Sequence, residues 1–294
     1  MEDGDLALRQ KAFAACNAGD WPTAARIYED LADRLPEGPW TSEWLSNATL
    51  GYKIMRDWER AFDLGRRAAR RAERGSRDPV FWNLGTAATM LGEWSVARDA
   101  WTGFGIEGIE PGEEEIEGDF GMACLRLHDE TGRDEVVWAE RICPTRARLV
   151  GIPTQVTGHG FGDVVLHDGS PDAYRVDACG ACVPVLDEVL VWRPGSLPTL
   201  RVRAKAPDRQ HFDALAESFS ARGFGFGFEV ANSPATLCRC GGGTANAAAD
   251  RVWPPLAGRQ TLWLAAPPDL AGSLLAQWRA AEPETRSHGE VEFV

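Results

Sequence analysis

Tryptophan and alanine recur at a fixed spacing in the first third of the chain, within stretches whose apolar positions follow a helical period. Each repeat has a turn containing Gly or Asp, then a Trp, then an Ala three residues later. The Trp residues lie 37 and 36 residues apart: Trp21, Trp58 and Trp94, followed by Ala24, Ala61 and Ala97. A small residue lets the helix after the turn approach the helix before it. The pattern predicts stacked helix pairs, because no pair can bury its apolar face alone.

Further aromatic and small residues within each repeat match the pattern of a known family. The third repeat carries the most of them: Phe81-Trp82-Asn83-Leu84-Gly85, Ala88, Ala97, Trp101 and Phe104. Residues 5–106 resemble the tetratricopeptide repeat family, although Gly65 stands where a large aromatic residue is usual. The resemblance implies a concave surface, lined by the first helix of each pair, that binds a protein or peptide. Partner-binding residues expected there are Arg9, Phe13, Asn17, Ser46, Lys53, Trp82, Thr86 and Thr89. Solvated or packing roles are the alternative for each of them.

Arginine is concentrated in the second repeat, between Arg66 and Arg74. At helical spacing these residues form a basic stripe beside an alanine stripe. We expect a solvated outer face that is partly paired with Glu59 and Asp63.

The composition changes after the repeats. Residues 107–119 contain seven acidic residues, no basic residue, three Gly and one Pro. Self-repulsion and glycine disfavour a packed core in such a segment. We therefore predict a helical repeat domain over residues 1–106, an acidic linker over 107–119, and β-containing modules beyond it.

The pattern in the second half of the chain predicts several strands, followed by an alternation of strands and helices. Residues 120–196 predict a β-rich meander or partial barrel, with Asp168-Gly169 as a hairpin turn between 163–167 and 173–177. Residues 197–294 follow a β-α-β…β-α-β order that predicts a ferredoxin-like module. The expected fold class is thus α+β and multidomain. Trp138–Val191 also resembles the C-terminal regions of uncharacterised bacterial tetratricopeptide proteins, which implies no activity.

Two groups of residues could form a metal, redox or catalytic site. Four thiolates can hold structural zinc, and two Cys pairs could supply them: Cys179 and Cys182, with Cys238 and Cys240. Unconnected buried thiols and a redox Cys-x-x-Cys are the alternatives. His159, Asp163, His167 and Asp168 form a His/carboxylate cluster whose members at 159, 163 and 167 share one face of an extended segment. Such a face suits either a catalytic metal or the end of a hairpin.

Charge and the N-terminal residues narrow the possible partners and compartment. The formal net charge of −13 disfavours nucleic acid and anionic membranes, and favours a basic protein. The acidic N-terminal residues lack the plan of a signal peptide, and no apolar run approaches the roughly 18 residues of a membrane span. We expect a cytoplasmic protein with reduced cysteines.

The leading functional hypothesis is a non-catalytic adaptor that binds a protein or peptide in its repeat groove. A sharper version is an immunity protein that neutralises a basic toxin, for example a nuclease. The competing class is an enzyme with a metal site in the second half. No nucleophile elbow or phosphate-binding loop supports that class.

Overall fold

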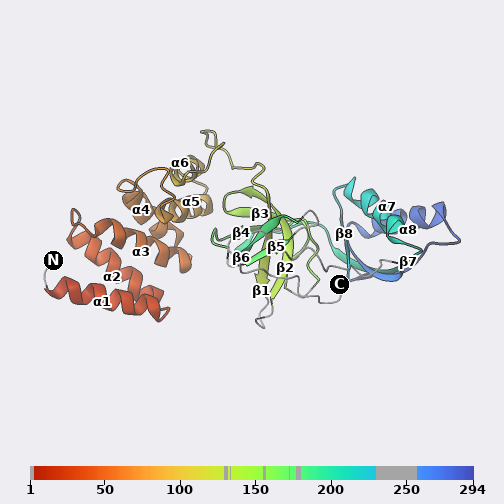
Figure 1. The fold of residues 1–294 in the computed structure, drawn as a ribbon, viewed down its shortest axis with the longest axis horizontal. Coiled ribbons are helices and arrows are strands. Elements are labelled where there is room, and N and C mark those ends of the chain that lie inside the picture. Colours follow the sequence, from red (N-terminus) through yellow and green to blue (C-terminus); the bar gives the residue numbers. More distant parts are fainter. Residues whose placement is uncertain are drawn as a thin grey trace. The chain divides into compact units, whose positions relative to one another are not determined.

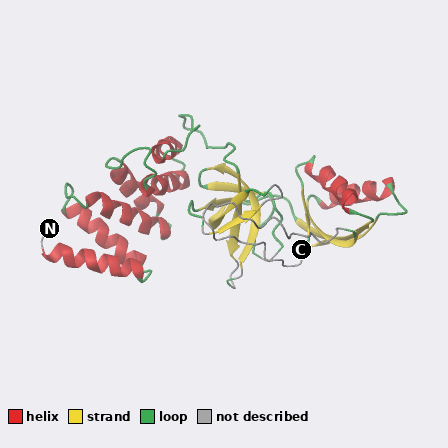
Figure 2. Cartoon of the chain, in the orientation of Figure 1, coloured by secondary structure: helices red, strands yellow, loops and turns green. Residues whose placement is uncertain are grey.

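The computed structural model describes residues 3–128, 132, 134–154, 157–171, 173–176, 180–229 and 257–294. These residues form two compact units, Met1–Glu117 and Gly118–Val294 (Figures 1 and 2). The first unit is all-α and the second combines strands and helices, which confirms the α+β class. Each unit is described by itself.

Three helix pairs build the first unit (Figure 1). Their bounds are α1 Asp3–Asn17, α2 Trp21–Arg34, α3 Thr41–Ile54, α4 Trp58–Ala69, α5 Pro79–Leu91 and α6 Trp94–Phe104. Each of the three repeating Trp residues opens the second helix of a pair. The prediction of stacked helical repeats is therefore confirmed.

Side chains from the turns stabilise the starts of three helices. The carboxylates of Asp20, Asp57 and Asp78 accept hydrogen bonds from backbone N–H groups in the first turns of α2, α4 and α5, at 3.2, 3.3 and 2.9 Å. Such caps satisfy N–H groups that have no partner within the helix. Gly92 and Gly105 end α5 and α6 in the left-handed conformation, which explains a glycine at both positions.

Glycines set the distance between neighbouring helices. A Cβ atom added at Gly85 would lie 2.6 Å from the ring of Trp101, and one at Gly103 would lie 2.6 Å from the ring of Phe81. At Gly65 of α4 it would lie 3.2 Å from Leu84. This contact explains why the second repeat lacks the usual large aromatic residue: α4 packs too closely on α5 to accommodate one.

The acidic segment after α6 folds back onto that helix. The guanidinium of Arg98 donates to the backbone oxygens of Glu110 and Glu114, both at 3.0 Å, and Ile116 is buried. The boundary between the two units falls within this segment, at residues 117 and 118.

A closed five-stranded barrel begins the second unit. Its strands are β1 Met122–His128, β2 Asp134–Cys143, β3 Arg146–Leu149, β4 Val164–His167 and β6 Cys182–Arg193. Consecutive strands of this set pair antiparallel, and β1 pairs with β6 in parallel to close the barrel. Alternate residues of β1, among them Leu125 and Leu127, point into the core. The sequence prediction named neither β1 nor β3.

The predicted hairpin across Asp168-Gly169 was wrong. β5, Ala173–Val176, pairs with Cys182–Val185 of β6, whereas β4 pairs with the same strand from Glu188 to Arg193. Because β6 is 12 residues long, it offers pairing positions to both short strands in succession.

The second unit ends in a four-stranded antiparallel sheet with two helices. The elements are β7 Thr199–Ala206, α7 Arg209–Ser220, β8 Gly225–Phe228, β9 Gly258–Ala265, α8 Pro268–Ala281 and β10 Ser287–Phe293. The strand order is β10-β7-β9-β8. Apolar residues of the strands and both helices share one core between the layers, as the ferredoxin-like prediction requires.

Candidate functional site

The residues expected to line a binding groove lie on the first helix of each pair, but their exposure differs along the array. On α1, Phe13 and Asn17 are exposed and Arg9 is half-buried. On α3, Ser46 is half-buried and Lys53 is buried. Open side chains are therefore concentrated on α1.

On α5 the expected groove residues are largely inaccessible. Trp82 packs edge-on against Trp101 and Phe104 of α6, with ring centroids 5.1 and 5.3 Å apart. Thr86 is buried and its hydroxyl donates to the backbone oxygen of Trp82 at 3.0 Å. Thr89 is fully buried. Of these three α5 residues, only the half-buried Trp82 offers any surface to a ligand.

An aromatic and apolar patch surrounds Arg9. On α1, Leu6 and Phe13 are 41% and 63% exposed, and their helical spacing places them on the same face as Arg9. The Arg9 guanidinium lies 4.4 Å from the ring centroid of Trp40, which is 40% exposed, and 3.3 Å from the carboxylate of Glu43. We call these five residues the α1 patch.

The α1 patch includes three residues that sequence reasoning missed. Leu6 precedes the first repeat motif, and Trp40 and Glu43 belong to the loop and first turn of α3. Only a helical-wheel comparison of Leu6 with Phe13 could have identified part of it. The approach of Trp40 to Arg9 depends on the packing of the helices.

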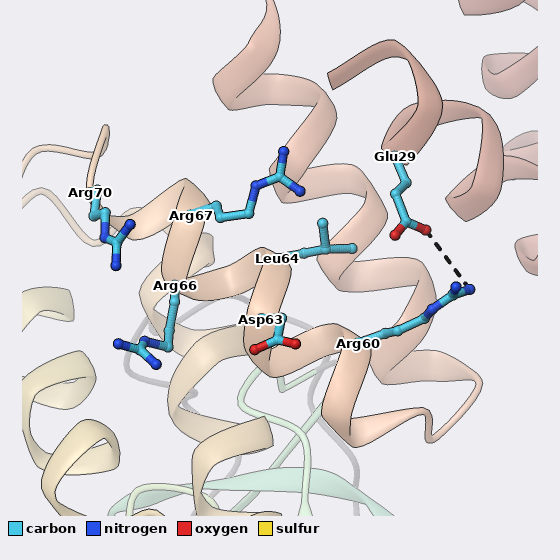
Figure 3. Close-up of a pocket in the computed structure, with 7 residues that line it drawn as sticks. All are labelled: Glu29, Arg60, Asp63, Leu64, Arg66, Arg67 and Arg70. Atoms are coloured by element: carbon cyan, nitrogen blue, oxygen red, sulfur yellow. Dashed lines mark ion pairs between the residues drawn. The ribbon is translucent and has the colours of Figure 1, made fainter. Parts of the chain in front are cut away.

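A second candidate, which we call the outer-face pocket, is lined by residues of α2, of α4 and of the turn after α4 (Figure 3). It is an open pocket of about 470 Å³. Its lining is Glu29, Arg60, Asp63, Leu64, Arg66, Arg67 and Arg70. Four of the seven residues are arginines, so the pocket is basic although the whole chain is acidic.

One edge of this pocket is held by a buried hydroxyl. Tyr52 donates to the carboxylate of Glu29, and Arg60 donates to the Tyr52 hydroxyl at 3.0 Å. Burial, and then the hydrogen bond to Glu29, raise the pKa of Tyr52 to about 12. Tyr52 therefore stays protonated and keeps Arg60 and Glu29 in place.

Most of the basic stripe, which runs from the last turn of α4 into the loop after it, is paired across repeats. Arg67 contacts Asp33 at 2.7 Å, and Arg71 contacts Glu37 at 3.5 Å. The predicted partners Glu59 and Asp63 lie on α4 itself. The actual acidic partners are Asp33 of α2, Glu37 of the loop after α2, and Asp99 of α6, which contacts Arg74 at 2.9 Å. The prediction of those two partners was wrong, because stacking brings acidic residues of both neighbouring repeats beside the arginines.

The His/carboxylate residues of the barrel do not converge. His159 contacts Glu188 at 2.8 Å, while the Asp163 carboxylate accepts from the backbone N–H groups of Gly160 and Gly195. Residues 157–163 form turns rather than the predicted extended face. Burial lowers the pKa of His167 to about 4, and this ring faces the backbone oxygen of Asp168 at 2.8 Å. Within the described parts of the chain, no three His, Cys, Asp or Glu side chains are grouped to hold a metal ion.

The proposed zinc ligands fall mostly outside the described residues. This applies to Cys179, Cys238 and Cys240, whereas Cys182 begins β6 as a half-buried free thiol. Zinc binding by the four residues therefore stays a prediction. Elsewhere, burial raises the pKa of the Cys124 thiol to about 11, which makes it unreactive at neutral pH.

Among the helices described, none combines the length and apolar character needed to cross a bilayer. No family model matches the chain, and no curated protein matches it. A solved structure of a hypothetical protein from Neisseria gonorrhoeae is similar over 58% of this chain and 92% of that chain, with 11% identity and a TM-score of 0.25. At that TM-score the similarity carries no argument about function.

Proposed function

We propose that the first unit is a tetratricopeptide-type module and that the protein is a non-catalytic adaptor that binds a protein or peptide. The three helix pairs, their repeat of 36 and 37 residues, and the close contact of Gly85 with Trp101 support this assignment. Stacked repeats expose one continuous surface formed by equivalent helices, which suits an extended partner.

The α1 patch is the observation that carries the proposal. Phe13 leaves 63% of its surface in contact with water, and complete burial of such a side chain contributes about 1.5–3 kcal/mol. Arg9 and Trp40 add a cation–π pair that can pack against a partner. Aromatic and arginine side chains are the residues that most often dominate binding energy at interfaces.

The net charge indicates the kind of partner. At −13 the chain attracts basic proteins over long distances and repels nucleic acid. A basic toxin is one such partner, and its neutralisation is a special case of the adaptor proposal.

Site-specific photo-cross-linking in the cells that produce the protein tests the proposal. A photoreactive amino acid replaces Phe13 in one variant and Leu270 in a control, because Leu270 on α8 is also an exposed apolar residue. We expect position 13, and not position 270, to form a discrete product with one protein, identified by mass spectrometry.

Titration of the purified partner then gives the contribution of the patch. We expect Phe13→Ala to weaken binding about tenfold or more, and Leu270→Ala to leave it unchanged. Because Phe13 is exposed, its removal leaves the thermal unfolding temperature of the chain unaltered. Equal cross-linking at both positions, or undiminished binding by Phe13→Ala, would contradict the proposal.

A further inference from the structure

The arginines of the outer-face pocket fall into two groups. Arg60 and Arg67 extend from α4 toward α2, where they meet Glu29 and Asp33 (Figure 3). Arg66 and Arg70 extend to the other side, one helical turn apart, and are exposed (Figure 3). Within the described residues, neither Arg66 nor Arg70 forms an ion pair. The Arg66 guanidinium lies 5.6 Å from the ring centroid of Phe62, an aromatic contact that leaves its charge without an acidic partner. The pocket thus contains two guanidinium groups that a carboxylate can approach.

The remaining lining determines what such a ligand must offer. The carboxylate of Asp63 lies between the two groups of arginines and, among the described residues, also has no ion-pair partner (Figure 3). Leu64 also lines the pocket, but it is buried and offers little surface to a ligand. The pocket therefore presents two cations and one anion that have no ion-pair partner among the described residues, within about 470 Å³.

A simpler explanation covers only part of this arrangement. Cations in the last turn of a helix interact favourably with its dipole, and Arg66 and Arg67 occupy the last turn of α4. The dipole effect does not require a concave lining. It also does not require two guanidinium groups that lack an acidic partner beside two that have one. It also gives no reason for arginines to gather in a chain whose net charge is −13.

We propose that the outer-face pocket binds an acidic polypeptide segment of a partner. Carboxylate side chains of the segment accept from Arg66 and Arg70, since guanidinium and carboxylate groups match in bidentate geometry. A backbone N–H of the segment donates to Asp63. This site lies on the second helices of the repeats and shares no residue with the α1 patch.

The same lining disfavours a compact phosphate group. A dianion placed between the arginines would approach the carboxylates of Asp63 and Glu29, and like charges at that range repel. An extended peptide spreads its charge and offers N–H donors as well. Charge complementarity therefore selects a carboxylate-rich peptide.

Fluorescence anisotropy with the full chain at low salt tests this proposal. The probe is a fluorescein-labelled peptide of about a dozen residues in which glutamate alternates with alanine, and a glutamine version is the neutral control. We expect saturable binding of the acidic probe, and a loss of about tenfold or more in Arg66→Glu/Arg70→Glu. The matched control is Lys11→Glu/Arg26→Glu, which changes the net charge equally at exposed positions outside the pocket.

Several results would overturn the proposal. Binding that falls equally in both double variants would follow net charge rather than the pocket, and absence of binding by the native chain would refute the site. Tighter binding of inorganic phosphate than of the probe, strengthened further by Asp63→Asn, would assign the site to a phosphate group. Self-association in sedimentation that disappears in Arg66→Glu/Arg70→Glu would assign it to a second copy of the chain.

Two further variants keep the test interpretable. Arg66→Gln/Arg70→Gln removes both charges without introducing new ones, so it should weaken probe binding even if the charge-reversed variant folds poorly. Phe13→Ala should leave probe binding unchanged. Failure of this proposal can therefore be separated from failure of the adaptor proposal.

Discussion

The contact between Gly85 and Trp101 gives a quantitative test of the helix stack. Trp101 is fully buried in α6 and its ring packs on Trp82 as well as on Gly85. A Cβ atom at position 85 would lie 2.6 to 2.7 Å from three atoms of the ring. Because the ring is rigid and enclosed, the helices must move apart to admit a methyl group.

Two effects of Gly85→Ala oppose each other. Alanine gains about 1 kcal/mol over glycine in a helix interior, whereas overpacking of a core costs about 1–3 kcal/mol. The close contact places this site near the upper end of that range, so we expect a net loss of about 1–2 kcal/mol of unfolding free energy. Gly272→Ala in α8 is the matched control, because nothing lies within 4 Å of the added Cβ. We expect that control to stabilise the chain by about 0.5–1 kcal/mol.

Urea unfolding followed by circular dichroism, with hydrogen exchange to locate each transition, measures both effects. In a Trp101→Leu background the smaller side chain leaves room, so Gly85→Ala should there become neutral or stabilising. If Gly85→Ala stabilises the native chain as much as Gly272→Ala does, then α5 and α6 are not packed as closely as described and the reasoning is refuted.

Three further predictions concern a helix cap and two histidines. Asp78→Ala removes the N-cap hydrogen bond of α5 and should lower the unfolding free energy by about 1 kcal/mol. Glu93→Ala is the control, because Glu93 is the N-cap of α6 and makes no side-chain capping bond. It should change the unfolding free energy by less than about 0.5 kcal/mol. The hydrogen bond to Asp208 raises the pKa of His211 above 6.5. The protonated His211 therefore stabilises the fold fully below pH 6.5, and this contribution is lost as pH rises through the folded-state pKa. His211→Gln should abolish that part of the pH dependence of thermal unfolding. His167 has the opposite sign, because burial lowers its pKa to about 4: stability falls as pH decreases from 6.5 toward 4, and His167→Gln should flatten this slope. An unchanged slope in either histidine variant would contradict the assigned linkage.

Local chemistry determined the helices and their ends. Trp21, Trp58 and Trp94 recur with small residues at helical spacing, and this periodicity is a property of the chain that needs no tertiary contact to be read. Asp20 and Asp57 precede their helices in sequence, so their capping role is equally local. The alternation of strands and helices after residue 197 likewise predicted the ferredoxin-like module.

Tertiary structure decided how the barrel closes. The parallel pairing of β1 with β6 joins residues about sixty positions apart, and alternation along one strand does not indicate its neighbour. Asp168-Gly169 has the residues of a hairpin turn, yet β4 and β5 both pair with β6. The long strand competes successfully with the local turn because it offers hydrogen bonds to both segments.

Tertiary structure also decided which surface residues are available to ligands. Phe13 and Thr89 both lie on first helices, but Phe13 is exposed and Thr89 is buried, since their environments depend on position within the stack. Arg67 pairs with Asp33 of the preceding repeat, and Arg66 on the same turn does not. The sequence specified a basic stripe, and the stacking of the helices neutralised part of it, because ion pairing depends on distances between side chains that only the packed repeats define.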